Sequence, residues 1–199
     1  MSDCHLTRIK RSKGVTMVEI SLGLAISAIV VASVYTGMKG SLRRNEITVN
    51  ADLIVEMVTA ARASYGQRGI FNQLTTSAAV QSGLIPRQYL RVNLADGEAA
   101  NSYGGSIELE ALNVFNTYAY LRFDAVPADQ CMPLVMAVND AVQGISVTNI
   151  DTNAKPTAAE DWNVKPHGEQ SKLDVEKLRV ACELEPSSNL HFSFNRGSS

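Results

Sequence analysis

The stretch that most constrains this chain is an apolar run near its N-terminus. From Ile20 to Met38 there are nineteen residues, and none of them is charged. As an α-helix rising about 1.5 Å per residue, such a run is long enough to cross a hydrocarbon layer about 30 Å thick. The basic residues before it predict that its N-terminal end lies on the cytoplasmic side. The chain is therefore expected to carry a membrane-spanning helix ahead of its globular part.

The charge of the chain changes sign after the first fourteen residues. Residues 1–14 carry a net charge of +3, and because the whole chain carries −2, the remainder carries −5. Nucleic-acid binding usually requires a basic excess, which the long part lacks, so we expect no nucleic-acid partner. With 199 residues, of which 45% are hydrophobic, the chain can form one globular domain with a large core plus an extension.

The apolar run differs from an ordinary secretory signal peptide. Such a peptide is cleaved at small residues that follow its apolar region, whereas the small residue suited to cleavage here, Gly14, precedes it. Cleavage at that point leaves the apolar helix on the mature protein. The run is rich in small residues, and the spacing of Gly23 and Ser27 lets helices approach closely. We therefore expect this helix to contact other helices as well as lipid.

Glu19 lies at the edge of the apolar run, where a carboxylate is costly. A charged group costs about 2.5–3.5 kcal/mol at the membrane centre and less near the boundary, so one interpretation is an interfacial acid. The other interpretation follows from cleavage after Gly14, which creates an ammonium group on Val15, four residues before Glu19. Between two staggered helices, the amine of one chain would neutralise the acid of the next.

These residues together resemble a known processing signal. A short basic leader, Gly14, the segment Val15–Glu19 and a long apolar helix resemble the class III signal of type IV prepilins. The resemblance implies that a prepilin peptidase removes the leader, residues 1–14, and methylates the new N-terminus at Val15. It also implies that Glu19 supports docking between subunits. Phenylalanine is the commonest first residue in that family, so Val15 favours the more varied type IVb branch.

The helical pattern continues past the apolar run. Residues 15–40 form the expected transmembrane and filament-core helix, and 41–199 the expected globular domain, which includes an amphipathic half of the same helix at about 41–67. In that half the apolar residues recur at spacings of three and four: Val49, Leu53, Ile54, Met57, Val58, Ala61 and Tyr65. This stripe predicts that the outer half of the helix is covered by the domain.

The rest of the chain predicts an α+β domain. We expect strands at 106–112, 117–124, 145–148 and 190–195, of which the first two form an antiparallel hairpin, while the strand order stays open. Helices are expected at 76–82 and from 127 to 144, and the segment 175–184 is either a short helix or irregular. Residues 149–172 are polar and are expected to form an exposed loop.

Short motifs along the domain also resemble the thin-pilus pilins of conjugative plasmids and enteric pathogens. They are, in chain order, Gly83–Pro86, Tyr103–Gly105, Val126–Cys131 and Cys182. The resemblance implies the type IV pilin fold, a long helix packed against an antiparallel sheet, with a Cys131–Cys182 disulfide bounding the C-terminal region. The residues alone leave two alternatives for the three cysteines: an even pair once a leader containing Cys4 is removed, or three free thiols in a cytosolic protein.

The sequence contains no convincing catalytic or metal-binding pattern. His5, His167 and His191 are scattered, and the position of His191 in the last strand predicts a surface or edge side chain. Residues 151–153 hint at a calcium loop, but Lys155 occupies a ligand position. Trp162 either anchors its own loop or contacts a partner. We therefore expect no enzyme activity, no cofactor and no metal.

The resemblance implies a structural function. It indicates the major pilin of a type IVb pilus that serves attachment, aggregation or mating-pair contact. The implied partners are further copies of the chain, the prepilin peptidase, the assembly machinery of the inner membrane and, before assembly, lipid. The implied location is the inner membrane with a periplasmic domain, then an extracellular pilus of a Gram-negative bacterium. The alternatives are a minor pilin, a secretion pseudopilin or, from another class, a membrane-anchored enzyme or binding protein.

Overall fold

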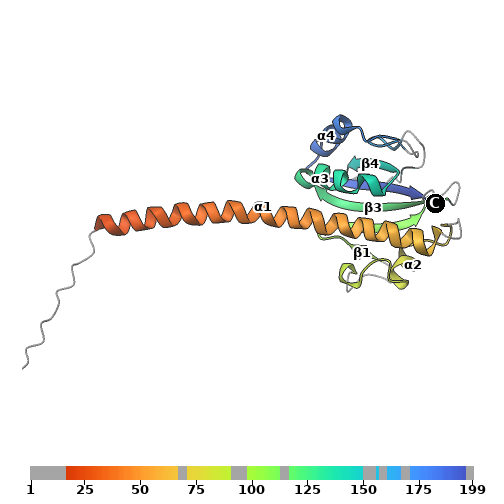
Figure 1. Ribbon diagram of the computed structural model, residues 1–199, viewed down its shortest axis with the longest axis horizontal. Coiled ribbons are helices and arrows are strands. Elements are labelled where there is room, and N and C mark those ends of the chain that lie inside the picture. Colours follow the sequence, from red (N-terminus) through yellow and green to blue (C-terminus); the bar gives the residue numbers. More distant parts are fainter. Residues whose placement is uncertain are drawn as a thin grey trace, which may run out of the picture. The chain divides into compact units, whose positions relative to one another are not determined.

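The computed structural model describes residues 17–66, 71–90, 98–112, 117–149, 156, 161–166 and 171–195. Its first element is α1, Met17–Ser64, which confirms the long helix predicted over about residues 15–67 (Figure 1). The chain forms two compact units, one ending at Leu42 and one beginning at Arg43, so α1 contributes residues to both. The second unit contains all the other elements.

A five-stranded antiparallel sheet forms the centre of the second unit. Its strands are β1 (Ala99–Ala100), β2 (Ser106–Ala111), β3 (Tyr118–Pro127), β4 (Gly144–Asn149) and β5 (Ser187–Asn195). The spatial order is β1-β2-β3-β5-β4. The predicted hairpin of β2 and β3 is confirmed, with Leu109 opposite Leu121. The last strand lies between β3 and β4, which settles the order that the sequence left open.

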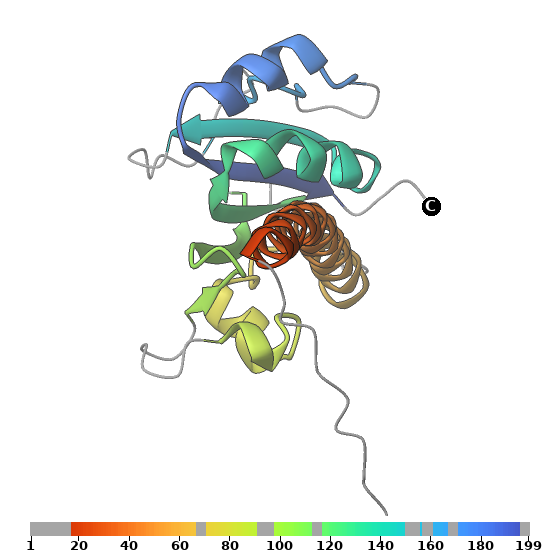
Figure 2. The same cartoon turned by 90° about the vertical axis from the view of Figure 1, so that its left-hand side faces the viewer.

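Three short α-helices and two 3₁₀ turns complete the described part of the unit (Figures 1 and 2). They are α2 (Thr76–Gln81), η2 (Arg87–Tyr89), α3 (Ala128–Val138), η3 (Asn139–Ala141) and α4 (Val175–Glu183). The side chains of Thr75 and Asp174 cap the N-termini of α2 and α4. The segment that the sequence left as helix or irregular is therefore a capped helix.

Helix α3 is shorter than predicted, because it ends at Val138 and not at Gly144. Gly144 is instead the first residue of β4 and pairs with Ser193. A side chain at Gly144 would collide with the hydroxyl of Ser193 and lie within 3.1–3.2 Å of the Trp162 ring, so the glycine is needed for close packing. The glycine is therefore needed because an aromatic ring packs directly on this strand. From sequence alone the same glycine predicted the end of a helix.

One face of the sheet forms a hydrophobic core with the helices. Directly opposite residues of antiparallel strands share a face, and Leu121 lies opposite Phe192 while Phe123 lies opposite Leu190. These side chains are fully buried and join one cluster with residues of α1, α3 and α4. The residues that alternate with these along each strand point to the other face and are mostly polar. The helices therefore lie on the apolar face.

The buried stripe of α1 agrees with the predicted one except at its ends. Five of the predicted residues are buried: Leu53, Ile54, Met57, Val58 and Ala61. Val49 is 43% exposed, so its assignment to the stripe was wrong, and Tyr65 is only partly buried. The corresponding core position is occupied by Asn50, which is fully buried and exchanges hydrogen bonds with the Ser102 hydroxyl.

The predicted exposed loop at 149–172 is wrong for several of its described residues. Trp162, Val164 and Lys165 are 4%, 0% and 8% exposed, because this segment covers the edge of β4. Ile145 and Lys165 exchange backbone hydrogen bonds at 3.0 Å, and the Asn163 amide bonds both backbone groups of Val147. The segment therefore satisfies the backbone groups that an edge strand would otherwise expose.

Candidate assembly site

The part of α1 that belongs to the first unit is an exposed apolar helix. Every residue from Met17 to Leu42 whose exposure is described is exposed. The hydroxyls of Ser21, Ser27 and Ser33 donate to backbone carbonyls three or four residues earlier, at 2.7–2.9 Å. These polar groups are therefore satisfied within the helix, as a lipid or protein interior requires. By length and composition, α1 is the one helix in the described part that could span a membrane.

Glu19 lies in the first turn of α1, where the helix dipole favours a carboxylate. Gly14 and Val15 lie outside the described residues, so the cleavage site and the pairing of the Val15 amine with Glu19 stay predictions. The other predictions that fall outside the described residues concern the leader 1–14 with Cys4 and His5, and also His167, residues 151–153 and Lys155.

Where α1 enters the second unit, a set of hydrogen bonds and one ion pair holds it to the domain. We call this set the polar clasp, and it consists of Arg43, Glu46 and Asn50 of α1 with Ser102, Tyr103, Asp129 and Gln130. The Gln130 amide donates to Glu46 at 3.0 Å and accepts from the Tyr103 hydroxyl at 2.7 Å. Arg43 pairs with Asp129 at 2.7 Å. Burial is the main cause that raises the pKa of Tyr103 to about 12, so this hydroxyl stays protonated.

Two of the short motifs found in the sequence supply the domain side of the polar clasp. The turn at 101–105 presents Ser102 and Tyr103, and its shape requires Gly104, whose φ of +84° favours glycine. The side chain of Asn101 closes the turn by accepting from the backbone of Tyr103 and Gly105. The motif at 126–131 begins α3 and presents Asp129 and Gln130. Both motifs thus fix the beginning of the covered half of α1.

The disulfide implied by the resemblance is present. Cys131 in α3 and Cys182 in α4 are bonded, with their Cα atoms 5.7 Å apart and a separation of 51 positions in sequence. In the loop-entropy model a bridge of this span stabilises the fold by about 4 kcal/mol. Both cysteines are buried in the hydrophobic core. The bridge therefore holds α4 to α3, which also carries part of the polar clasp.

The prediction for His191 was wrong, because β5 is a central strand. His191 is fully buried, with one ring nitrogen 2.7 Å from the Tyr120 hydroxyl and the other 2.7 Å from the Thr148 hydroxyl. A neutral ring satisfies this arrangement by donating one hydrogen bond and accepting the other. Burial, with a smaller contribution from Arg122, lowers the pKa of His191 to about 4. Burial also raises the pKa of Tyr120. The group is a structural network within the sheet.

The described residues offer little for catalysis. No cluster of three or more His, Cys, Asp or Glu side chains among them could hold a metal ion. Arg122 forms a two-bond ion pair with Asp124 and a longer contact of 3.3 Å with Glu108, all at the polar face of the sheet. Trp162 is buried against the sheet, which confirms that it anchors its own segment.

Comparisons with known proteins address the fold. No protein-family model and no curated protein matches the sequence. Among solved structures, a type IVb pilin from Salmonella typhi aligns with a TM-score of 0.47 and 16% identity, over 71% of this chain and 95% of that chain. TcpA, a type IV pilin from Vibrio cholerae El Tor biotype, aligns with a TM-score of 0.51 and 16% identity, over 75% of this chain and 98% of that chain. The chain has the type IV pilin fold.

The type IV pilin fold was the fold predicted from the sequence, and it is confirmed with its long helix, antiparallel sheet and C-terminal disulfide. At 16% identity the likeness concerns the fold alone. Within this fold the sequence correctly identified the apolar helix. It missed the polar clasp as a unit, and the only signal for it was the pair of short motifs at 101–105 and 126–131.

Proposed function

We propose that this protein is the structural subunit, the major pilin, of a type IVb pilus. The observation that carries the proposal is the exposed apolar helix of residues 17–42 on a chain with the type IV pilin fold. About seven turns of uncovered apolar helix would aggregate in water unless lipid or protein covers them, and a filament core made of such helices supplies that cover. The product is a filament that serves attachment, aggregation or mating-pair contact.

The proposed pathway begins in the inner membrane of a Gram-negative bacterium. A prepilin peptidase cuts between Gly14 and Val15 and methylates the Val15 amine, while the domain stands in the periplasm. The assembly machinery then transfers the apolar helix from lipid into the filament. In that dry core the Val15 ammonium of one subunit neutralises Glu19 of its neighbour, because neither charge is stable there alone.

Mass spectrometry of the mature protein tests the processing step. We expect the chain to begin at methylated Val15, and an intact Met1 on the cellular protein would contradict the proposal. Electron microscopy of sheared surface filaments tests the assembly step, and quantifying the chain in them distinguishes a major from a minor subunit. A protein that is absent from filaments would remove the proposed function.

The variant Glu19→Gln tests the role of the acid. It keeps the size of the side chain and one acceptor oxygen but removes the charge, so we expect normal membrane insertion and loss of filaments. The matched control is Glu98→Gln, which removes an exposed acid from a position outside α1. Filaments at the normal level from Glu19→Gln would show that the charge is not needed.

A further inference from the structure

The most basic stretch after the leader lies where α1 enters the second unit. The segment 39–44 has three basic residues and no acid, which gives it a charge of +3. Since the chain after Gly14 carries −5, of which Glu19 contributes −1, residues 45–199 carry −7. An acidic domain therefore follows a short basic segment of the helix.

Two arginines of this segment, Arg43 and Arg44, have exposed side chains. Arg43 pairs with Asp129 of the polar clasp at 2.7 Å. The other acid of the clasp, Glu46, accepts from the Gln130 amide at 3.0 Å. Arg44 has no side-chain hydrogen bond or ion pair with any residue in the described part of the chain. A guanidinium carries five N–H donors and stays charged, so those of Arg44 are available to a ligand outside the chain.

The position of Arg44 along α1 corresponds to a layer of lipid headgroups. The helix is continuous from Met17 to Ser64 and has no charged residue from Ile20 to Met38. Twenty-five positions separate Glu19 from Arg44, which is about 38 Å of helix. A bilayer measures about 40–45 Å with its headgroups. A helix that spans it with Glu19 in one headgroup layer therefore brings Arg44 into the other.

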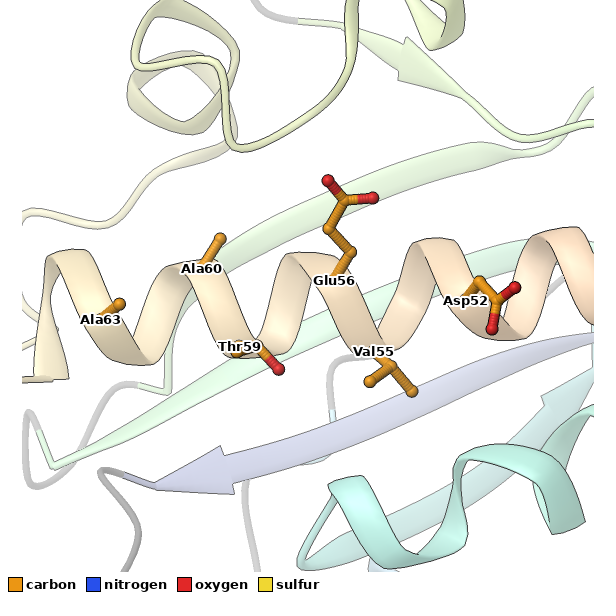
Figure 3. Close-up of a pocket in the computed structure, with 6 residues that line it drawn as sticks. All are labelled: Asp52, Val55, Glu56, Thr59, Ala60 and Ala63. Atoms are coloured by element: carbon orange, nitrogen blue, oxygen red, sulfur yellow. The ribbon is translucent and has the colours of Figure 1, made fainter.

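The exposed acids of α1 lie further along the helix than this layer. Asp52 and Glu56 are exposed, and Figure 3 shows both carboxylates projecting from the helix, where they line part of a shallow hollow. Asp52 follows Arg44 by eight positions, or about 12 Å of helix. This distance exceeds the screening length of about 8 Å at physiological salt. The two acids therefore do not cancel the attraction of Arg44 for a phosphate.

We propose that Arg44 binds the phosphate of a phospholipid headgroup, in the leaflet next to the domain, and so fixes the depth of the unassembled subunit in the membrane. This proposal rests on the proposed function, because it requires α1 to span a bilayer. Arginine and phosphate form charge-assisted hydrogen bonds, often two at once. Sinking the helix would carry the guanidinium towards hydrocarbon, and raising it would break the bonds to phosphate.

The contact makes Arg44 a positioning residue for the opposite end of the span. With Arg44 held at one headgroup layer, Glu19 stays in the other layer and the uncharged residues between them stay in hydrocarbon. The acid is then kept out of the membrane interior until assembly begins.

Solid-state NMR of the processed full chain tests the contact directly. The chain, with ¹³C at the Cζ atoms of its arginines, is placed at a low protein-to-lipid ratio in vesicles of phosphatidylcholine and phosphatidylglycerol. We expect lipid ³¹P to dephase part of the arginine signal, and Arg44→Gln to lose most of that part. Arg87→Gln, which removes an exposed arginine outside α1, should keep it. No dephasing in the unaltered chain, or full dephasing in Arg44→Gln, would overturn the proposal.

A second sample distinguishes a lipid phosphate from a free one. The same labelled chain is placed in micelles of an uncharged maltoside detergent with inorganic phosphate in the buffer. We expect no dephasing at Arg44 there, because the proposed ligand is held at the depth of the headgroups. Dephasing equal to that in vesicles would indicate an adventitious ion only and would contradict the proposal.

The depth of the helix tests the consequence of the contact. A nitroxide on Leu42→Cys, an exposed position of α1, reports its depth through its accessibility to oxygen and to a water-soluble nickel chelate. We expect Arg44→Gln to move the label towards hydrocarbon and Arg44→Lys to restore most of the original depth. An unchanged depth in Arg44→Gln would remove the positioning role. Both measurements use unassembled subunits, so their failure leaves the proposed function intact, whereas a chain absent from filaments removes that function alone.

Discussion

The two halves of α1 differ in composition and have opposite surroundings. Ile26 in the first half is 54% exposed, whereas Ile54 in the second half is 0% exposed. In the second half the domain supplies the cover, with an apolar sheet face beneath the helix and a polar clasp where the covered half begins. In the first half the described residues supply none. One helix can thus be exposed in its first half and part of the core in its second, and the domain determines only the latter.

The halves also differ in how they satisfy their polar groups. In the first half, serine hydroxyls bond to carbonyls of the same helix. In the second half, Glu46 and Asn50 bond to residues at least 52 positions away in sequence. A self-sufficient helix can move between lipid and protein without losing hydrogen bonds, whereas the second half depends on a fixed partner.

The largest predicted difference is in the response to truncation of a buried side chain. Ile54→Ala leaves a cavity in the core and should lower the free energy of unfolding of the domain by about 2–5 kcal/mol. Ile26→Ala is the matched control, and it should leave that free energy unchanged because Ile26 has no cover to lose. Chemical denaturation of the full chain in detergent, followed by the fluorescence of its single tryptophan, measures both. Similar losses from the two variants would show that the halves are not distinct.

Much of this contrast could be predicted from sequence, since it rests on periodicity. The uncharged run and the later three-and-four spacing located both halves of α1, and alternation located β3 and β5. Which residues of each turn are buried was harder to predict, because a buried asparagine lies within the apolar stripe. Asn50 lies in the core only because Ser102, 52 residues later, satisfies its amide. No local pattern records such a pairing.

The errors share this non-local origin. His191 was assigned to a surface or edge because alternation shows which residues of a strand share a face but not which strands lie beside it. In the structure β5 lies between β3 and β4. The polar segment 161–166 was assigned to solvent, yet its asparagine substitutes for a strand backbone at the edge of β4. For the candidate site, sequence located the apolar half but not the polar clasp, whose members come from three separate segments, and the role of Glu19 stays a prediction.

A smaller loss of stability should come from low pH, which destabilises the sheet that covers the second half of α1 but does not change α1 itself. The pKa of His191 is lowered to about 4 from an unfolded value near 6.5, so the unfolded chain binds more protons between these values. The stability that the neutral ring contributes is therefore complete above pH 6.5 and is lost as the pH falls towards 4, by at most about 3 kcal/mol. Denaturation of the unaltered chain and of His191→Gln at several pH values measures this contribution. An equally steep decline in the variant would assign it to other groups.

The smallest effect should come from the polar clasp, and it should be confined to the beginning of the second half. Gln130→Leu removes the hydrogen bonds to Glu46 and Tyr103 and leaves both of those groups without this partner, at a cost of about 1–3 kcal/mol. We expect amide hydrogen exchange over residues 43–50 to accelerate by about 5- to 150-fold where local opening governs it. Exchange over residues 17–42 should not change, because the hydrogen bonds that the variant removes join Gln130 to Glu46 and Tyr103 of the second unit. Gln81→Leu, at an exposed glutamine of α2, is the control. Acceleration that spread over the whole helix would mean that α1 opens as one unit and that its two halves are not energetically separate.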